Sequence, residues 1–343
     1  MATNGPETRP GGVDEADAAS APETEESEGA SGANGSETES GKAAAAAEVP
    51  HPAFAPYAAE DVPQAAVGSP GKDGTLELRF EAGAGGTDMV RDYATVPFHV
   101  SGTLGHDPHP DAETVFVQSP TGGVAQGDRL DQTVAVEAGA VAHVSTQSST
   151  KVQSMARNYA RSQTHLSVGA GGHLDFVPEP TILHADARFA GETTLDLAEG
   201  ATAIVGEVVV PGRLARGEQF DFERYCSTVE AEGPEGLLLA DATHLAPADR
   251  DPTAPGVLGE YTVYGTLFVV APDCDAATLN DALHDAVADS EGRAGATELP
   301  NSAGVAVRAL GDRAETVQAT LHAAWDHARR ELIDAPAPSG RKY

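Results

Sequence analysis

The stretch Val134-Ala-Val-Glu-Ala-Gly139-Ala-Val-Ala-His-Val144 has the pattern of a strand, a glycine turn and a second strand. Leu166-Ser-Val-Gly-Ala-Gly171-Gly-His-Leu-Asp-Phe176 repeats this pattern, and Leu195-Asp-Leu-Ala-Glu-Gly200-Ala-Thr-Ala-Ile204 repeats it again. The turn glycines are 32 and 29 residues apart. Units of about 30 residues favour stacked β layers or a solenoid-like body, because each unit needs neighbours to cover its apolar face. A β-sandwich with similar hairpins fits the spacing equally well.

Strand-like patterns continue on both sides of the repeat. Apolar residues alternate with polar ones from Leu76 to Val269, and turn-forming residues separate the runs. A period of two is typical of strands with one buried face. We therefore expect residues 71–271 to form a β body.

The segment 272–334 has a helical pattern instead. Asp275 can cap a helix that runs to Ser290, and a second helix is expected from about Asp312 to Ile333. Between them, the residues around Val305 predict a strand. The expected fold class is mainly β: a β-helix-like, stacked-layer body with two C-terminal α-helices.

Residues 1–70 differ in composition from the rest of the chain. The first aromatic residue is Phe54 and the first leucine is Leu76, whereas Gly, Ser, Glu and Ala dominate. Such a segment buries too little apolar surface to compensate for the entropy lost on ordering. We expect an acidic, disordered extension over 1–70 and one domain over 71–343.

The charge balance excludes several classes of function. The chain has 21 basic and 53 acidic residues, which gives a formal net charge of −32. Binding to nucleic acids requires a basic face, and anionic membranes disfavour an acidic protein for the same reason. No apolar run is long enough to span a bilayer, and the first residues lack the features of a signal peptide. We expect a cytoplasmic protein from a salt-adapted host, since salt screens the repulsion between surface acids.

Common catalytic and metal motifs are absent or incomplete. Gly122-Gly-Val-Ala-Gln-Gly127-Asp128 has the glycine spacing of a phosphate loop, but Asp128 stands where the lysine should be. No HExxH, paired CxxC or EF-hand pattern occurs, so no fixed metal site is predicted. The loop from His106 to Asp111 has irregularly spaced His and Asp residues and is a weak candidate for ligands.

Polar residues next to or within predicted strands are the remaining candidates. Ser145-Thr-Gln-Ser-Ser-Thr-Lys151 is dense in hydroxyl groups. Glu207 lies inside an apolar run and must form a pair, take up a proton or face water in a cavity. Its possible partners are Arg213 and Arg216. A structural ion pair and an acid-lined channel or metal path both remain open.

Six short motifs occur in a fixed order along the chain: Gly122–Asp128, Thr146-Gln147 with Lys151, Phe176-Val-Pro-Glu-Pro180, Gly212-Arg213 with Gly217–Phe220, Gly304–Arg308 and Trp325–Arg329. Taken together, they resemble the UreD (also called UreH) family of urease accessory proteins. The resemblance covers about residues 74–333 and departs from the family at Gln153, where an aromatic residue is frequent.

The resemblance implies a function that spacing alone does not show. UreD proteins are non-catalytic scaffolds, or chaperones, with a β-helix-like body and two helices. They bind the urease apoprotein and UreF, and UreF brings the GTPase UreG. Nickel is inserted through this complex, so the resemblance implies metallocentre assembly without enzymatic activity, with transient nickel and no tightly bound cofactor.

Site residues follow from the family motifs and from the chemistry of nickel transfer. Spaced oxygen ligands can pass a nickel ion on, whereas a His/Cys cage would trap it. The expected partner surface is around Trp325 and Arg329, although Trp325 fits the core equally well. The candidate path residues are Asp128, Thr146, Glu179, Glu207 and Glu218, supported by Gln147, Lys151 and Arg213. Arg213 is expected to hold either Glu207 or Glu218 in place.

Two alternatives come from other classes. One is a β-helical enzyme acting on carbohydrate, with Glu179 and Glu218 as general acid and base. The other is a purely structural β-solenoid subunit.

Overall fold

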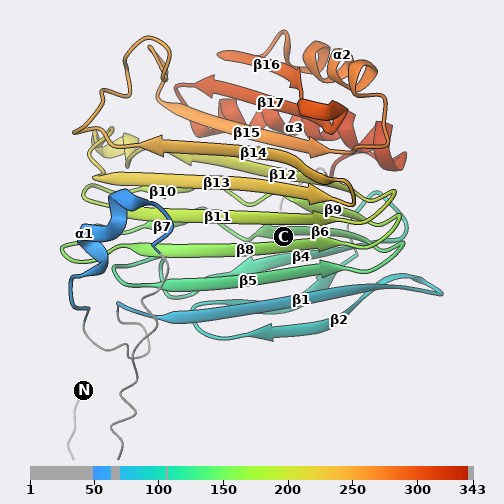
Figure 1. Ribbon diagram of the computed structural model, residues 1–343, viewed down its shortest axis with the longest axis horizontal. Coiled ribbons are helices and arrows are strands. Elements are labelled where there is room, and N and C mark those ends of the chain that lie inside the picture. Colours follow the sequence, from blue (N-terminus) through green and yellow to red (C-terminus); the bar gives the residue numbers. More distant parts are fainter. Residues whose placement is uncertain (1–48, 63–69, 106, 339–343) are drawn as a thin grey trace, which may run out of the picture. The chain divides into compact units, whose positions relative to one another are not determined.

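The chain forms two large β-sheets that lie face to face, with two C-terminal helices on one of them (Figure 1). A computed structural model describes residues 49–62, 70–105 and 107–338. From Glu48 onward these residues belong to one compact unit. Residues 1–48 and 63–69, which hold most of the expected acidic extension, lie outside the described part of the chain.

The first sheet has seven strands in the order β14-β13-β11-β8-β5-β1-β2. The strands from β1 to β13 in this order are parallel, and β2 and β14 are antiparallel edges. Its strands are β1 (Asp73–Gly83), β2 (Gly86–Ala94), β5 (Arg129–Val136), β8 (Ala160–Val168), β11 (Arg188–Leu197), β13 (Arg224–Gly233) and β14 (Gly236–Leu245).

The second sheet has ten strands, eight of them in the order β16-β17-β15-β12-β9-β6-β4-β3. The short strand β10 pairs with β12 and with β7. Its strands are β3 (His99–Leu104), β4 (Ala112–Gln118), β6 (Val141–Thr146), β7 (Thr150–Val152), β9 (His173–Phe176), β10 (Thr181–Leu183), β12 (Thr202–Val210), β15 (Val263–Val270), β16 (Arg293–Glu298) and β17 (Gly304–Gly311).

The sequence repeat is the repeat of the fold. Val134 pairs with Leu166, and Leu166 pairs with Leu195, in the parallel strands β5, β8 and β11. Each unit then turns at its glycine and enters the second sheet as β6, β9 or β12. Gly139 and Gly200 both have φ of 70°, in the left-handed region that glycine enters at little cost. The predicted mainly β, solenoid-like body is confirmed, and a plain sandwich is excluded.

The space between the sheets is the main apolar core. Leu78, Val134, Leu166 and Leu195 of the seven-stranded sheet are buried there against residues such as Val144 of the ten-stranded sheet. Because side chains alternate along a strand, the neighbouring positions face outward. The interior therefore has a fixed set of inward positions. A polar residue at one of them breaks the apolar pattern and is a candidate functional residue.

Two helices cover the outer face of the ten-stranded sheet, as the sequence predicts. Helix α2 (Ala276–Val287) begins with Asp275 as its N-cap and ends before the predicted Ser290. Helix α3 (Ala314–Ile333) packs Leu321 and Trp325 against the sheet. The edge strand β16 was not predicted, because its residues are small or polar and none of them is buried.

Residues 49–62, which we name the N-terminal strap, are folded, although the sequence places them in a disordered extension. They contain a 3₁₀ turn (Pro52–Phe54) and the single-turn helix α1 (Ala55–Ala58). Phe54 is fully buried in a cluster with Tyr159, Ala190 and Cys226 on the outer face of the seven-stranded sheet. This burial explains why a proline-rich segment is ordered here.

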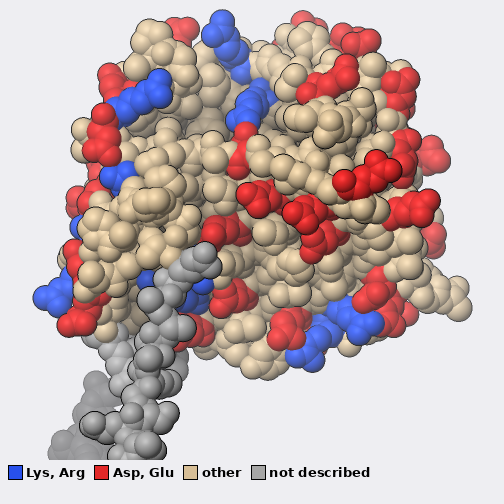
Figure 2. Space-filling model, viewed as in Figure 1, with Lys and Arg blue, Asp and Glu red and all other residues tan. Residues whose placement is uncertain are grey.

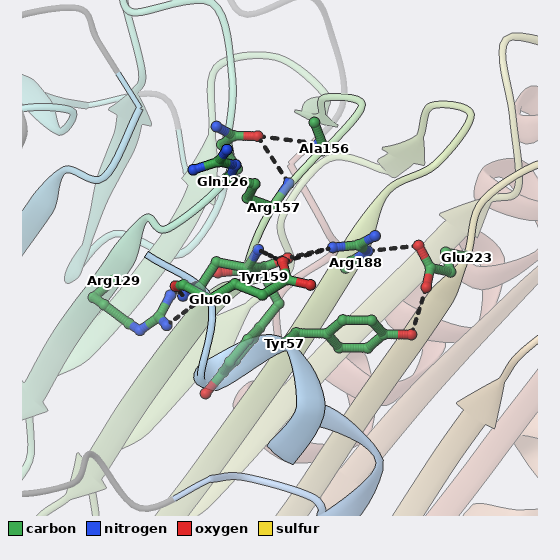
Figure 3. Close-up of polar contacts among 10 residues, drawn as sticks. Tyr57, Glu60, Gln126, Arg129, Ala156, Arg157, Tyr159, Arg188 and Glu223 are labelled. Carbon is green, nitrogen blue, oxygen red and sulfur yellow. Dashed lines mark hydrogen bonds and ion pairs between the residues drawn. The ribbon is translucent and has the colours of Figure 1, made fainter. Parts of the chain in front are cut away.

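Polar contacts complete the attachment of the strap (Figure 3). The Tyr57 hydroxyl donates a hydrogen bond to Glu223 over 2.6 Å, and the Arg188 guanidinium lies 4.4 Å from the Tyr57 ring centroid. The Glu60 carboxylate accepts a hydrogen bond of 2.6 Å from the main-chain nitrogen of Asn158. The partners lie 98 or more residues away along the chain, so local sequence could not reveal them.

Acidic side chains are spread over the face shown in Figure 2 and do not gather in one patch. This distribution is typical of acids whose role is solvation. None of the helices in the described part of the chain is long and apolar enough to cross a membrane.

Candidate functional site

A cavity of about 520 Å³, the helix cavity, lies between α3 and the outer face of the ten-stranded sheet. Phe116 of β4 and His143 of β6 form part of its wall, and Trp325 of α3 lies opposite them. Glu179, just after β9, and Glu315, in the first turn of α3, add carboxylates. The cavity thus combines aromatic walls with acidic groups.

A second cavity of about 130 Å³, the interior cavity, opens beside the Gly122–Asp128 loop. Gln132, Thr146 and Ser162 line it together with Lys151. The Gln132 amide lies 3.3 Å from the Ser162 hydroxyl. Thr146 and Lys151, which the sequence predicts as a path residue and a supporting residue, therefore line the same cavity at this polar end of the interior.

Glu207 lies on β12 with its carboxylate between the two sheets. Its Oε1 accepts hydrogen bonds from the Tyr225 hydroxyl at 2.5 Å and the Ser227 hydroxyl at 2.8 Å, both on β13 of the opposite sheet. Burial raises the pKa of Glu207, and these two hydrogen bonds only partly offset that effect. Glu207 also belongs to the ring of residues around the helix cavity, but its carboxylate points away from α3.

Thr146 and Glu179 are brought together. The Thr146 hydroxyl accepts a hydrogen bond of 2.9 Å from the main-chain nitrogen of Glu179. The Glu179 carboxylate accepts one of 3.1 Å from the Gln318 side chain of α3. Glu179 thus faces the helix cavity, whereas Thr146 lines the interior cavity.

Asp128 is buried at the base of the glycine loop. Its carboxylate forms an ion pair of 2.8 Å with Lys72 and accepts hydrogen bonds from the main-chain nitrogens of Lys72 and Ala125. A carboxylate neutralised by a lysine is a poor metal ligand, so the structure favours a structural role. Gly127 above it has φ of 75° and packs against Val62 of the strap.

Arg213 pairs with Glu218 and not with Glu207, the other partner that the sequence allowed for it. The hydrogen bond from Arg213 lowers the pKa of Glu218 and keeps this group ionised. A glycosidase acid needs the opposite shift, and Glu218 does not line the helix cavity that Glu179 lines. These facts weaken the carbohydrate-active alternative.

The other supporting residues lie at the same end of the fold. The Gln147 main-chain nitrogen donates to the Val117 carbonyl over 2.9 Å, which extends the β4–β6 pairing. Lys151 is exposed on β7. Gln153 donates a hydrogen bond to the Gly122 carbonyl over 2.9 Å, so an amide holds the glycine loop where relatives of the predicted family often carry an aromatic ring.

Trp325 and Arg329, around which the sequence predicts a partner surface, are both buried, so Trp325 has the core position that the sequence allowed equally. The Arg329 guanidinium forms ion pairs of 2.5 Å with Asp107 and with Asp175, and all three side chains are fully buried. The Trp325 ring nitrogen donates to Asp175 over 2.7 Å. Local sequence does not reveal this network, because Trp325 and Arg329 on α3 lie 150 or more residues from the two aspartates.

His173 completes the network around Asp175. Its Nε2 lies 3.3 Å from the Asp175 carboxylate. Burial alone would raise the pKa of Asp175, but the charge and hydrogen bond of His173 and the charge of Arg329 hold it at about 2. Within the described ranges, no three His, Cys, Asp or Glu side chains are close enough together to hold a metal ion.

Comparisons of this chain with protein families and with known proteins point to the same family. The family described as UreD urease accessory protein matches residues 72–342. A urease accessory protein UreD of Haloarcula marismortui is 74% identical over 298 residues, covering 87% of this chain and all of that protein. Its counterpart in Natronomonas pharaonis is 45% identical over 85% of this chain and 98% of its own length. Another, from Yersinia pseudotuberculosis, is 35% identical over 88% and 95%.

Proposed function

Because the chain belongs to the UreD family of urease accessory proteins, we propose that it is a docking platform and nickel conduit that catalyses no reaction itself. It binds the urease apoprotein and UreF in the cytoplasm, and UreG joins through UreF. It acts as a chaperone of metallocentre assembly, with nickel as cargo. Neither nucleic acid nor membrane takes part, in keeping with the net charge of −32.

One observation supports the proposed conduit: a strip of polar residues crosses the otherwise apolar space between the two sheets. In the seven-stranded sheet, Ser162 pairs with Gly191, Gly191 with Ser227, and Ser227 with Thr243. Ser162 lines the interior cavity, and Ser227 donates to Glu207. Gly191 has no side chain, and the Phe189 ring and the Ser227 hydroxyl lie 3.4 and 3.8 Å from where its Cβ would stand. The proposed path follows this strip from the cavity of Thr146 to the carboxylate of Glu207.

The candidate path residues differ in the groups that hold their carboxylates, and this difference decides which of them can ligate nickel. Glu207 is held by the hydroxyls of Tyr225 and Ser227, which carry no positive charge that would compete with a metal ion. Asp128 and Glu218 are neutralised by Lys72 and Arg213. Oxygen ligands that hold nickel weakly suit a path from which the ion must leave. Thr146 and Glu207 therefore fit the interior path, and Glu179 fits its outer side.

In a urease-positive strain that lacks this gene, we expect little active urease, and the wild-type chain should restore it. Glu207→Gln should keep the hydrogen-bonding shape but lower the nickel content and activity of urease several-fold, because an amide is a much weaker nickel ligand than a carboxyl group that can release its proton to the ion's charge. The measurement is nickel per urease together with urease activity, at equal amounts of the accessory chain.

Glu230→Gln is the matched control, because it removes an exposed carboxylate from β13 and should behave as wild type. Normal urease maturation without the gene would contradict the proposed function. Full activation by Glu207→Gln would remove only Glu207 from the path.

A further inference from the structure

The strap lies on the seven-stranded sheet as a peptide lies in a groove. It crosses the beginnings of β8, β11 and β13 on the outer face of this sheet (Figure 1). Phe54 is its buried anchor, with its ring centroid 4.9 Å from that of Tyr159. Tyr57 and Glu60 follow at intervals of three residues, and both reach Arg188, one with its ring and one with its carboxylate (Figure 3). The groove therefore recognises two aromatic rings and one acidic group.

The attachment of the strap is local, because the apolar cores of the fold form without it. Half of the strap residues are exposed, and Phe54 is the one that is buried. No described residue of the strap belongs to the apolar clusters that join the two sheets or hold α2 and α3. Segments with few buried contacts open at a lower free energy than the body of a protein. The two sheets therefore keep their cores when the strap is away.

The end of the strap supports the glycine loop that borders the interior cavity. A Cβ atom on Gly127 would lie 2.5 Å from Val62, so glycine is needed for this close contact. The Gln126 side chain of the same loop accepts a hydrogen bond of 3.0 Å from the main-chain nitrogen of Ala156, just before β8 (Figure 3). The other end of the loop, Gly122-Gly123, lines the cavity. A detached strap thus leaves one wall of the cavity without its outer support.

We propose that the strap is a detachable peptide ligand of this groove, and that its attachment clamps the glycine loop at the edge of the interior cavity. The class of ligand is a peptide with two aromatic residues and a carboxylate at intervals of three, as in Phe54, Tyr57 and Glu60. Detachment itself requires neither urease nor nickel. Its role as a control on the nickel path rests on the proposed function.

The two cysteines of the chain make detachment measurable in the full-length protein. Cys226 packs with Phe54 beneath the strap, and burial raises the pKa of its thiol, so it reacts slowly while the strap is attached. Cys274 is half-buried just before α2 and serves as the internal reference. We expect iodoacetamide in molar KCl to modify Cys226 at a rate that changes little with urea below the unfolding transition, because a local opening exposes little surface. A rate that follows global unfolding would overturn the proposal.

Two substitutions in the strap should speed this reaction. Tyr57→Phe removes the hydrogen bond of 2.6 Å to Glu223 and should raise the rate at Cys226 about three- to tenfold. Phe54→Ala removes the buried anchor and should raise it by at least about tenfold. The matched control is Tyr93→Phe, an exposed tyrosine on β2, which should leave the rate unchanged. If neither strap variant speeds the reaction, the proposal is wrong.

A synthetic peptide with the sequence of residues 49–62 tests the groove as a binding site. Added to the Phe54→Ala chain at about 1 mM, the order of effective concentration that a short linker provides, it should slow the modification of Cys226 in a saturable manner. The same peptide with alanine at position 54 should not. If Phe54→Ala lowers the urea midpoint of the whole chain, Tyr57→Phe takes its place. An absence of protection would show that the strap is a fixed part of the fold and not a ligand.

Ser162→Cys tests the clamp, because Ser162 lines the interior cavity together with the glycine loop. Its added thiol should react faster when Phe54→Ala is also present, and the peptide should reverse this gain, while Cys274 keeps its rate. An unchanged rate at position 162 while Cys226 responds would overturn the clamp. Since urease is absent from these experiments, their failure leaves the proposed function standing.

Discussion

Arg329→Met is expected to lower the free energy of unfolding by about 3–5 kcal/mol. Methionine fills similar space but leaves Asp107 and Asp175 as two buried carboxylates without their cation. A buried charge that loses its partner retains the full cost of desolvation. Urea unfolding at a fixed high salt concentration measures the effect as a shift in midpoint.

The next residue provides the control. Arg330 is exposed and pairs with Asp326 one turn earlier on the same helix. Arg330→Met should therefore cost less than about 1 kcal/mol. Similar losses in the two variants would show that the buried network is not what anchors α3 to the sheet.

Acid should destabilise the protein through Asp175. Its pKa is about 2 in the folded chain, against an ordinary value of 3.8. The folded pKa is depressed, so the contribution is fully present above the unfolded value and is lost as the pH falls through the folded value. The difference corresponds to about 2–3 kcal/mol, lost between about pH 5 and pH 2.

The measurement compares the free energy of unfolding of the wild-type chain and Asp175→Asn across this pH range. The advantage of the wild type should shrink by about 2–3 kcal/mol towards low pH, because asparagine does not titrate. A difference between the two chains that does not change with pH would show that Asp175 is not the group responsible.

The body of the fold was predictable because its signal is periodic. Gly139, Gly171 and Gly200 mark equivalent turns, and the residues before them stack in register in β5, β8 and β11. A strand such as β1 shows its inward face through the alternation of buried and less buried residues, whatever its partner is. The number of sheets and the order of the strands follow from stacking such units.

The strap was not predictable, because its order comes from distant partners. The strap has only Phe54 and Tyr57 as aromatic residues among its prolines, and the composition of this segment indicates disorder. The burial of Phe54 depends on a cluster with Tyr159, Ala190 and Cys226. Such a contact leaves no periodic trace in the sequence.

Charged partners were predicted well only when they were close in sequence. Arg213 and Glu218 are five residues apart, and their pairing was one of the two that the sequence allowed. Glu207, by contrast, was expected near an arginine but is held by two hydroxyls of the opposite sheet. Arg329 was placed on the surface, because a lone arginine in a helix gives no sign of carboxylates brought to it by the fold.

Co-purification is the most direct test of the docking platform. Tagged chain, urease apoprotein and UreF are mixed in molar KCl, and the complex is separated by size and its nickel measured after exposure to a nickel salt. We predict that the three proteins elute together and that nickel reaches urease only in that complex. A chain that elutes alone under these conditions, while urease acquires the same nickel without it, would contradict the account.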